Sequence, residues 1–326
     1  MASNAGKRPK VFVTRKDVPQ NAIDLLKSSC EIIQYDGVGA VPRAVLKERV
    51  AEVDGLFCLL TDKIDGDLLD VAKKLKVVGT MSVGYDHIDV KECQKRGVLL
   101  GNTPDVLTEA TAELTVALLL CTARRLTEAA DEVRNGGWGT WNPLWMCGKS
   151  LQGSTIGILG LGRIGLSVAK KLLPFEPAKL IYYNRSEQDA AATVNAEYVS
   201  MDKLLSESDF LIITCALTTE TRQLFNKKTF AQMKNDAILI NTSRGPIVSM
   251  DDLFEALSTG QIGAAGLDVT DPEPLPTDHR LLTLKNCVVL PHIGSATVAT
   301  RMRMASLAAE NILAGLSGQP LPASIY

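Results

Sequence analysis

Three polar side chains in the second half of the chain could together support the reduction of a 2-oxo acid. Arg244, Glu273 and His292 each come soon after a predicted strand. A guanidinium can bind a carboxylate through two parallel hydrogen bonds, an imidazolium can give its proton to a carbonyl oxygen, and a carboxylate can hold the imidazole. Open α/β sheets bind their ligands at the carboxyl ends of the strands. Each residue alone would be an ordinary solvated side chain, but the set predicts a catalytic site.

Histidine is rare in this sequence, so each of the three can be judged separately. His292 directly follows a predicted strand and Pro291. His279 lies in a polar loop and is expected to be solvated, whereas His87 lies in a loop of the first half and is expected to be structural. The sequence therefore indicates His292 as the proton donor.

A glycine-rich turn indicates the cofactor for such a reduction. It reads Gly160-Leu161-Gly162-Arg163-Ile164-Gly165 and stands between a predicted strand, residues 154–159, and a predicted helix. The first glycine permits a tight turn, the second lets a pyrophosphate reach the backbone, and the third lets helix and strand pack closely. The motif alone is weak, but this context predicts a dinucleotide site. We expect cofactor contacts from Gly160, Gly162, Arg163, Ile164 and Gly165.

The residues after the next predicted strand, 179–183, indicate which dinucleotide is bound. Sites that prefer NAD have an Asp or Glu there, which accepts hydrogen bonds from the ribose hydroxyls. Here the chain reads Asn184-Arg185-Ser186, so no carboxylate repels a 2′-phosphate, Arg185 can pair with it, and Asn184 and Ser186 can donate hydrogen bonds. The alternative is that Arg185 is an ordinary solvated side chain. We predict NADP(H) as the preferred cofactor, with NAD(H) as the second choice.

Strands and helices alternate along the whole chain, which predicts two doubly wound α/β domains with parallel sheets. The length of 326 residues exceeds what one hydrophobic core usually supports. We expect a flavodoxin-like substrate-binding domain, residues 1–106 with 297–326, and a Rossmann dinucleotide-binding domain, residues 107–296, with a cleft between them. One long helix, residues 109–135, should begin the second domain. The predicted strands are residues 11–14, 31–34, 55–60, 76–80 and 98–100 in the first domain, and 154–159, 179–183, 210–215, 237–241, 263–267 and 287–290 in the second.

All three tryptophans of the chain, Trp138, Trp141 and Trp145, lie in one glycine-rich segment, residues 136–153. They could be core residues of the same chain, which is the usual location of a single tryptophan. Alternatively, the tryptophan-rich segment packs on a second subunit, because three such side chains in a Gly/Pro-rich loop are difficult to bury within the same chain. The composition favours neither interpretation.

The overall composition favours a small-molecule partner. With 35 basic and 37 acidic residues the formal charge is −2, which gives no bulk attraction to nucleic acid or to an anionic membrane. The seven cysteines are scattered without a C-x-x-C pair, so neither a disulfide framework nor a metal site is predicted. No apolar run has the length of a membrane span, and residues 1–10 lack the apolar core of a secretion signal. We expect a cytoplasmic protein.

The order of the motifs resembles the D-isomer-specific 2-hydroxyacid dehydrogenase family. Ser243-Arg244-Gly245 is followed by Asp268-Val269, Glu273-Pro274 and Pro291-His292-Ile293-Gly294. The resemblance extends to Val83-Gly84, to Thr111-Ala112-Glu113 and to the glycine-rich turn, so it spans nearly the whole chain. The segments most similar to animal members that reduce glyoxylate and hydroxypyruvate are Met81-Ser82-Val83-Gly84, Asn135-Gly136-Gly137-Trp138, Pro143-Leu144-Trp145 and residues 281–287.

The resemblance implies NADPH-dependent reduction of glyoxylate to glycolate and of hydroxypyruvate to D-glycerate, with Arg244, Glu273 and His292 as catalytic residues. It also implies a homodimer joined through the dinucleotide-binding domain and the tryptophan-rich segment. Substrate contacts are then expected from the backbone of Val83 and Gly84, from Arg244, His292 and Ser295, and from Trp141 of the neighbouring subunit. Further cofactor contacts are expected from Ala216, Thr242, Asp268 and Gly294.

Two alternatives stay open at this point. The chain could be another member of the family with a different substrate, although formate dehydrogenases have Gln in place of Glu273 and long phosphoglycerate dehydrogenases carry extra domains for which this chain has no room. It could also be a dinucleotide-sensing corepressor of the same family, which binds the cofactor without turnover. The nearly neutral charge and the short tails argue against a corepressor.

Overall fold

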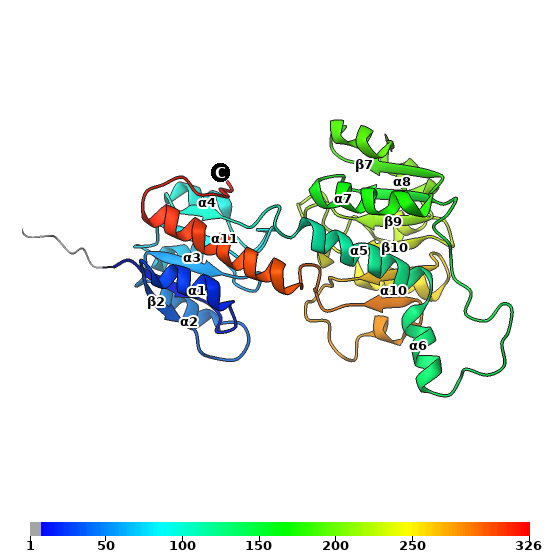
Figure 1. Cartoon of the computed structure of the whole chain (residues 1–326), viewed down its shortest axis with the longest axis horizontal. Helices are drawn as coiled ribbons and strands as arrows, with labels where there is room; N and C mark the ends of the chain where they lie inside the picture. Colours follow the sequence, from blue (N-terminus) through cyan, green and yellow to red (C-terminus); the bar gives the residue numbers. More distant parts are fainter. Residues whose placement is uncertain (1–7) are drawn as a thin grey trace, which may run out of the picture. The chain divides into compact units, whose positions relative to one another are not determined.

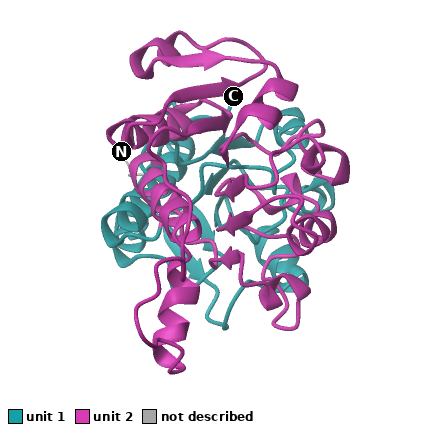
Figure 2. Ribbon diagram, turned by 90° about the vertical axis from the view of Figure 1, so that its right-hand side faces the viewer, with its two compact units in different colours: residues 1–107, 296–326 teal, residues 108–295 magenta. Residues whose placement is uncertain are grey.

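The computed structural model describes residues 8–326, and the chain divides into two compact units (Figure 2). The first unit combines Met1–Leu107 with Ala296–Tyr326, and the second is Thr108–Ser295. Each unit has its own parallel β-sheet with helices packed against it. The prediction of two doubly wound α/β units is therefore confirmed.

The first unit is built on five parallel strands in the order β2-β1-β3-β4-β5. Every residue of β3 and β4 is buried. Such continuous apolar runs are typical of parallel strands that are covered on both faces. The strands are β1 (Lys10–Val13), β2 (Glu31–Gln34), β3 (Gly55–Cys58), β4 (Val77–Thr80) and β5 (Leu99–Gly101), and the helices between them are α1 (Gln20–Lys27), α2 (Arg43–Val50), α3 (Gly66–Val71) and α4 (Val90–Lys95).

The last helix of the chain, α11 (Val298–Leu316), returns to the first unit, as predicted, and lies along α1 and the sheet (Figure 1). The contact is close because β4 has a glycine at the crossing: a Cβ atom at Gly79 would lie 2.5 Å from the Ala308 carbonyl oxygen. After α11, the chain end runs beside β5, where the Ile325 N–H donates to the Leu100 carbonyl over 2.9 Å. The first and last parts of the sequence therefore share one core.

The second unit has seven parallel strands in the order β12-β11-β10-β9-β6-β7-β8. The chain starts at β6, moves outward through β7 and β8, and then crosses back to β9 on the other side of β6, so the topological switch point lies at the end of β6. The short strand β8 was not predicted. The strands are β6 (Thr155–Leu159), β7 (Lys179–Tyr183), β8 (Ala196–Tyr198), β9 (Phe210–Ile213), β10 (Ile238–Asn241), β11 (Ala264–Leu267) and β12 (Cys287–Val289).

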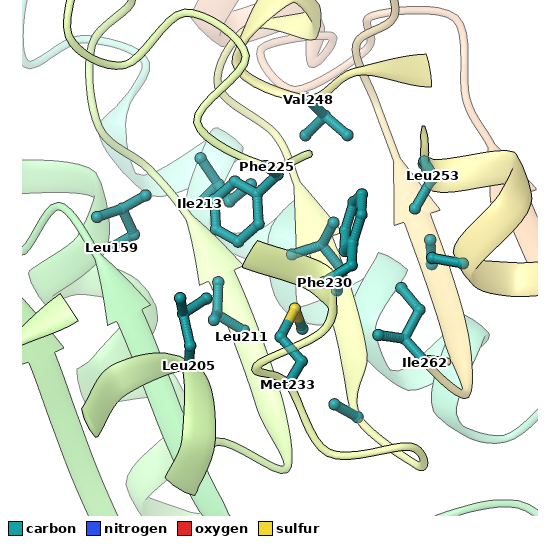
Figure 3. Close-up of a cluster of buried hydrophobic side chains, with 14 of the residues drawn as sticks. Leu159, Leu205, Leu211, Ile213, Phe225, Phe230, Met233, Val248, Leu253 and Ile262 are labelled. Carbon is teal, nitrogen blue, oxygen red and sulfur yellow. The ribbon is translucent and has the colours of Figure 1, made fainter. Parts of the chain in front are cut away.

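Two apolar cores lie on the two faces of this sheet. Figure 3 shows one of them, in which Phe225 and Phe230 pack together with ring centroids 6.3 Å apart. Both side chains are almost completely buried, and truncation of such a phenylalanine to alanine typically costs about 3–5 kcal/mol. The helices of this unit are α5 (Thr108–Ala123), α6 (Leu126–Arg134), α7 (Arg163–Leu172), α8 (Met201–Glu207), α9 (Lys227–Phe230) and α10 (Met250–Ser258), and the 3-10 helices are η1 (Leu173–Phe175), η2 (Asp189–Val194), η3 (Gly245–Ile247) and η4 (Arg280–Thr283).

The prediction of one long helix over residues 109–135 is wrong, because the helix breaks between α5 and α6. Arg125 has a left-handed backbone with φ 54°. The Ala123 carbonyl, which a continuing helix would bond to its own next turn, instead accepts the Lys149 N–H over 2.9 Å. The chain that returns from the tryptophan-rich segment therefore ends α5, and α6 starts in a new direction.

Helix α6 and the tryptophan-rich segment project from the rest of the second unit (Figures 1 and 2). No residue of α6 is buried. Trp138, Trp141 and Trp145 are 67, 82 and 40% exposed, and Leu144 is 82% exposed. The interpretation of these tryptophans as core residues of the same chain is therefore excluded, and a large apolar surface is left without a cover in the described part of the chain.

None of the helices in residues 8–326 is both long and apolar enough to cross a membrane.

Candidate active site

His292 and Glu273, which the sequence indicated from separate loops, are directly bonded. The Nδ1 atom of His292 shares a short hydrogen bond with Oε1 of Glu273. The two side chains are 27 and 39% exposed, so the pair is held by the protein but open to a ligand. Because Nδ1 is occupied, Nε2 is the ring nitrogen that a substrate can meet.

The loop that carries His292 has an unusual backbone, which Asp268 holds in place. His292 has φ 54°, in the left-handed region that L-residues rarely adopt, at a cost of about 1–2 kcal/mol. The Asp268 carbonyl accepts the His292 N–H over 2.8 Å, and its two carboxylate oxygens accept the N–H groups of Ile293 and Gly294, each over 2.8 Å. Asp268 therefore accepts three hydrogen bonds from this loop, which fix the backbone that carries the imidazole.

The Asp268 side chain is only 1% exposed. Burial raises the pKa of its carboxyl above the ordinary value, while the two backbone N–H bonds and the neighbouring His292 act in the opposite direction. The predicted contact between Asp268 and the cofactor stays a prediction. Its observed bonds go to the His292 loop.

Arg244 stands at the same edge of the sheet, in the loop after β10. The strand order places β10, β11 and β12 side by side and parallel, so the loops with Arg244, Glu273 and His292 follow adjacent strand ends. The fully buried Asn241 holds the arginine loop: its amide donates to the Arg244 carbonyl over 2.9 Å, and its side-chain oxygen accepts the Ser243 N–H over 3.1 Å. The three predicted catalytic residues thus share one sheet edge.

The glycine-rich turn follows β6 at the switch point of the sheet, and its three glycines have the expected, different surroundings. Gly160 has φ +99°, and a Cβ atom there would lie 2.6 Å from the Cys215 backbone nitrogen. A Cβ at Gly165 would lie 2.4 Å from the Gly160 carbonyl oxygen, whereas a Cβ at Gly162 would have no atom within 4 Å. Gly162 is the N-cap of α7, so the open space lies at the helix start, where a phosphate group fits.

The residues expected at a 2′-phosphate lie in the loop after β7. Asn184 is half-buried, and its side-chain oxygen accepts the Leu161 N–H over 2.7 Å, which ties this loop to the glycine-rich turn. Arg185 and Ser186 are exposed. Asn184 therefore has a bond to the turn that the sequence did not predict, and the two exposed residues follow it.

The other predicted cofactor contacts lie after neighbouring strands of the same sheet. Ala216 is exposed in the loop after β9. Thr242 is buried, and its hydroxyl is within 2.8 Å of the Thr115 hydroxyl on α5. Arg163 and Ile164 begin α7, and Gly294 follows the His292 loop.

The remaining predicted substrate contacts are on other parts of the chain. Ser295 is half-buried beside the His292 loop, and Val83 and Gly84 are half-buried in the loop after β4 of the first unit. Trp141 is on the tryptophan-rich segment.

The other two histidines have structural surroundings. His279 is half-buried, and its Nδ1 accepts the Leu281 N–H at the start of η4 over 3.2 Å. His87 bonds through Nε2 to the Thr80 hydroxyl over 3.1 Å. In residues 8–326 no cluster of His, Cys, Asp or Glu could hold a metal ion.

The sequence did not predict that Asn241 and Asp268 position the loops at this edge. Each is a buried polar residue at the carboxyl end of an otherwise apolar strand. A polar side chain in that place must find partners in the following loop, since unpaired buried polar groups are costly. This pattern could have identified both.

Comparisons with known proteins show which family the chain resembles over nearly its whole length. Residues 116–294 match the family model described as "D-isomer specific 2-hydroxyacid dehydrogenase, NAD binding domain". The chain is 52% identical over 319 residues to the human protein named glyoxylate reductase/hydroxypyruvate reductase, covering 97% of both chains. It is 45% identical over 322 residues to a glyoxylate reductase of Thermofilum pendens, covering 98% of this chain and 94% of that protein.

A solved structure is also similar over nearly the whole chain. It is an NADPH-dependent glyoxylate/hydroxypyruvate reductase from Sinorhizobium meliloti in complex with NADP and malonate. The TM-score is 0.86 at 31% sequence identity, and the match covers 98% of this chain and 97% of that one.

Proposed function

The chain belongs to the D-isomer specific 2-hydroxyacid dehydrogenase family, and we propose that it reduces glyoxylate to glycolate and hydroxypyruvate to D-glycerate, with NADPH as the reductant. The observation that carries the proposal is the bonded pair of His292 and Glu273 beside the Arg244 loop. The names of the relatives support the choice of substrates, since two of them act on glyoxylate by name at 45 and 52% identity.

In this proposal His292 is the general acid. Its Nε2–H gives a proton to the C2 oxygen of the 2-oxo acid as that oxygen gains charge. Glu273 accepts the hydrogen bond from Nδ1, which fixes the ring's orientation and stabilises the imidazolium before the transfer. Asp268 acts through the backbone and sets the direction in which the ring leaves the loop.

The substrate's carboxylate is assigned to Arg244 and to the Val83-Gly84 loop. Arginine suits this task because its planar fork matches both oxygens of a carboxylate. Ser295 is assigned to the remainder of a small hydroxylated substrate, and Trp141 to the same group from a neighbouring subunit. A substrate held in this way has its C2 oxygen directed at the acid.

The glycine-rich turn and the Asn184 loop fit a dinucleotide. Gly162 leaves the start of α7 open to a pyrophosphate, and Gly160 and Gly165 keep the turn tight. Ala216, Thr242 and Gly294 follow other strands at the same sheet edge, and we assign them to the cofactor as well. When bound, the cofactor supplies the hydride for C2.

We propose a preference for NADPH because none of the three residues directly after β7 is a carboxylate and Arg185 is exposed there. An acidic group at residue 184 would accept hydrogen bonds from the ribose hydroxyls of NADH and would repel the 2′-phosphate of NADPH. Asn184→Asp should therefore lower the ratio of kcat/KM for NADPH to that for NADH by about tenfold or more. Steady-state kinetics with both cofactors measure this ratio. A wild-type protein that prefers NADH would contradict the proposal.

We also propose a homodimer in which the tryptophan-rich segment and α6 contact the second copy. The exposure of Trp138, Trp141 and Leu144 supports it, because such an apolar surface is typical of an interface. Sedimentation at micromolar concentration tests the dimer, and a monomer would contradict it. The cytoplasmic location stays a prediction.

The function is tested by NADPH oxidation with a panel of 2-oxo acids that includes glyoxylate, hydroxypyruvate, pyruvate and 2-oxoglutarate. We expect the highest kcat/KM with glyoxylate or hydroxypyruvate. A higher value with another member of the panel would move the protein to a different substrate class in the family. No turnover of any substrate, together with tight NADPH binding, would favour a sensor of the dinucleotide.

A further inference from the structure

The loop that contains Val83 and Gly84 is held by an unusual set of hydrogen bonds in the first unit. Three consecutive backbone carbonyls, those of Ser82, Val83 and Gly84, each accept a bond from the same unit. We propose that Ser82 and Asn102 are positioning residues, which hold this loop in the conformation whose N–H groups bind the substrate's carboxylate. This inference rests on the proposed function, in which the loop meets that carboxylate.

Each of the three carbonyls has a different donor. The Thr103 N–H donates to the Ser82 carbonyl over 2.9 Å, and the Asn102 amide donates to the Val83 carbonyl over 2.8 Å. The Ser82 hydroxyl donates to the Gly84 carbonyl over 2.7 Å. Two of the donors are side chains, and both belong to buried residues that follow strands, with Ser82 3% and Asn102 7% exposed. Two of the three bonds can therefore be removed by substitution.

The direction of the bonds around Ser82 is fixed by chemistry. A carbonyl only accepts, so the Ser82 hydroxyl must give its single hydrogen to Gly84. The Thr80 hydroxyl, 2.8 Å from the Ser82 oxygen, must then donate to it, and Nε2 of His87, 3.1 Å from Thr80, must donate in turn. The chain of hydrogen bonds therefore runs from His87 through Thr80 and Ser82 to the Gly84 carbonyl.

Asn102 is also fixed from behind, by the last helix of the chain. Its carbonyl accepts the side-chain amide of Asn311 on α11 over 3.0 Å. Asn311 is completely buried, and its side-chain oxygen accepts the Ala323 N–H over 2.9 Å. A Cβ at Gly101 would lie 2.4 Å from Asn311, so only glycine fits beside it. The amide that holds Val83 is thus supported by the helix and by the chain end.

These bonds determine what the loop offers to a ligand. In a trans peptide unit the N–H lies opposite the C=O, so three fixed carbonyls also fix the N–H groups of Val83, Gly84 and Tyr85. None of these three N–H groups donates to an atom of residues 8–326. A run of oriented backbone N–H groups can bind an anion, and the proposal assigns the substrate's carboxylate to this run.

The test uses Ser82→Ala and Asn102→Ala in the full-length protein. Each variant removes one side-chain donor and frees one carbonyl to turn. We expect the KM for glyoxylate to rise about tenfold in each, since a hydrogen bond to a charged group is worth roughly 1.5–3 kcal/mol. The KM for hydroxypyruvate should rise by the same factor, because the carboxylate is common to both. The kcat and the KM for NADPH should change less than about twofold.

A matched control separates positioning from a general loss of packing. Ser208 is completely buried in the second unit, and its hydroxyl donates to the Leu204 carbonyl over 2.5 Å. Ser208→Ala should therefore lower thermal stability as Ser82→Ala does but leave both KM values unchanged. If Ser82→Ala and Asn102→Ala leave the KM for glyoxylate unchanged, or change the KM for NADPH equally, the inference is wrong.

A binding measurement keeps this inference separate from the proposed function. Calorimetry gives the affinity of the NADP⁺-saturated protein for oxalate, a small carboxylate that is not reduced. We expect about tenfold weaker oxalate binding in both variants than in the wild type. Weaker binding without any turnover by the wild type would contradict the proposed substrates and keep the positioning role. Equal oxalate affinity in all three proteins would overturn the positioning role.

Discussion

The Val83-Gly84 loop of the first unit and the His292 loop of the second unit are both held by a buried polar side chain, but the direction of the hydrogen bonds is reversed. Each loop follows a strand of a parallel sheet and is held by a side chain from the end of a neighbouring strand. In the first unit the Asn102 amide donates to a loop carbonyl, whereas in the second the Asp268 carboxylate accepts from two loop N–H groups.

The difference teaches how one type of fold supplies two kinds of chemistry. When donors occupy the carbonyls, the loop keeps its N–H groups for an anion. When a carboxylate occupies the N–H groups of Ile293 and Gly294, these groups are not available to a ligand, and in the proposed mechanism the His292 side chain with its partner Glu273 supplies the chemistry. In the proposed mechanism the first loop therefore binds the anion and the second loop carries the proton donor.

The largest expected effect is that of removing the imidazole. His292→Ala should lower kcat for glyoxylate roughly 10²–10⁴-fold, which is the usual contribution of a positioned general acid. NADPH binding, followed by fluorescence titration, should stay unchanged. His279→Ala is the matched control, because His279 only caps η4 in the same unit. A His292→Ala protein with the turnover of the wild type would remove proton transfer from this loop.

An intermediate effect is expected when the support of the His292 loop is weakened. Asp268→Asn keeps the shape of the side chain, but an amide has only one oxygen and cannot accept from both Ile293 and Gly294. We expect kcat to fall about tenfold and the free energy of unfolding to fall by about 1–3 kcal/mol, the usual cost of an unsatisfied buried group. Turnover assays and urea denaturation measure the two quantities. Unchanged kcat would mean that the loop needs no such support.

The smallest effect is expected at the opposite edge of the second sheet, away from the residues that we assign to the substrate and the cofactor. Asp209 precedes β9, and its carboxylate accepts from the Thr155 N–H over 2.8 Å and from Lys149 and Lys234 over 3.1 and 3.0 Å. Burial raises the pKa of this carboxyl, but these three bonds outweigh burial and the net pKa lies below the ordinary 3.8. Asp209→Asn should leave kcat unchanged.

The sign of the pH dependence follows from the lowered pKa. The ionised Asp209 stabilises the fold above pH 3.8, and this contribution is lost as the pH falls through the pKa of the folded protein. At neutral pH, Asp209→Asn should lower the free energy of unfolding by about 1 kcal/mol, and the difference should vanish in acid. Urea denaturation at several pH values checks this. A difference that does not depend on pH would show that the ion pairs contribute nothing.

The fold could be predicted largely because most of the parallel strands are short, continuous runs of buried residues with helices between them. What escaped prediction depends on distant contacts. The break at Arg125 occurs because Lys149, far along the chain, bonds to the Ala123 carbonyl, and no local pattern shows this. The strand β8 is short and mostly exposed, so it lacks the apolar signal of the others.

The site could be predicted in its residue types but not in its support. Arg244, Glu273 and His292 have side chains with distinctive chemistry, and their places after strands were readable. The work of Asp268 and Asn102 is done on the backbone of other loops, and the sequence does not show which loop is adjacent. The exposure of the tryptophan-rich segment likewise could not be predicted, because three tryptophans are equally compatible with a core and with an interface.

The central claim is the reduction of a 2-oxo acid at C2 to the D-isomer, and the fate of the hydrogen tests it most directly. The protein is incubated with hydroxypyruvate and NADPH that carries deuterium at both C4 positions, and the glycerate is recovered for chiral analysis and mass spectrometry. The account predicts D-glycerate with one deuterium at C2. Glycerate of the opposite configuration, or no labelled glycerate at all, would contradict it.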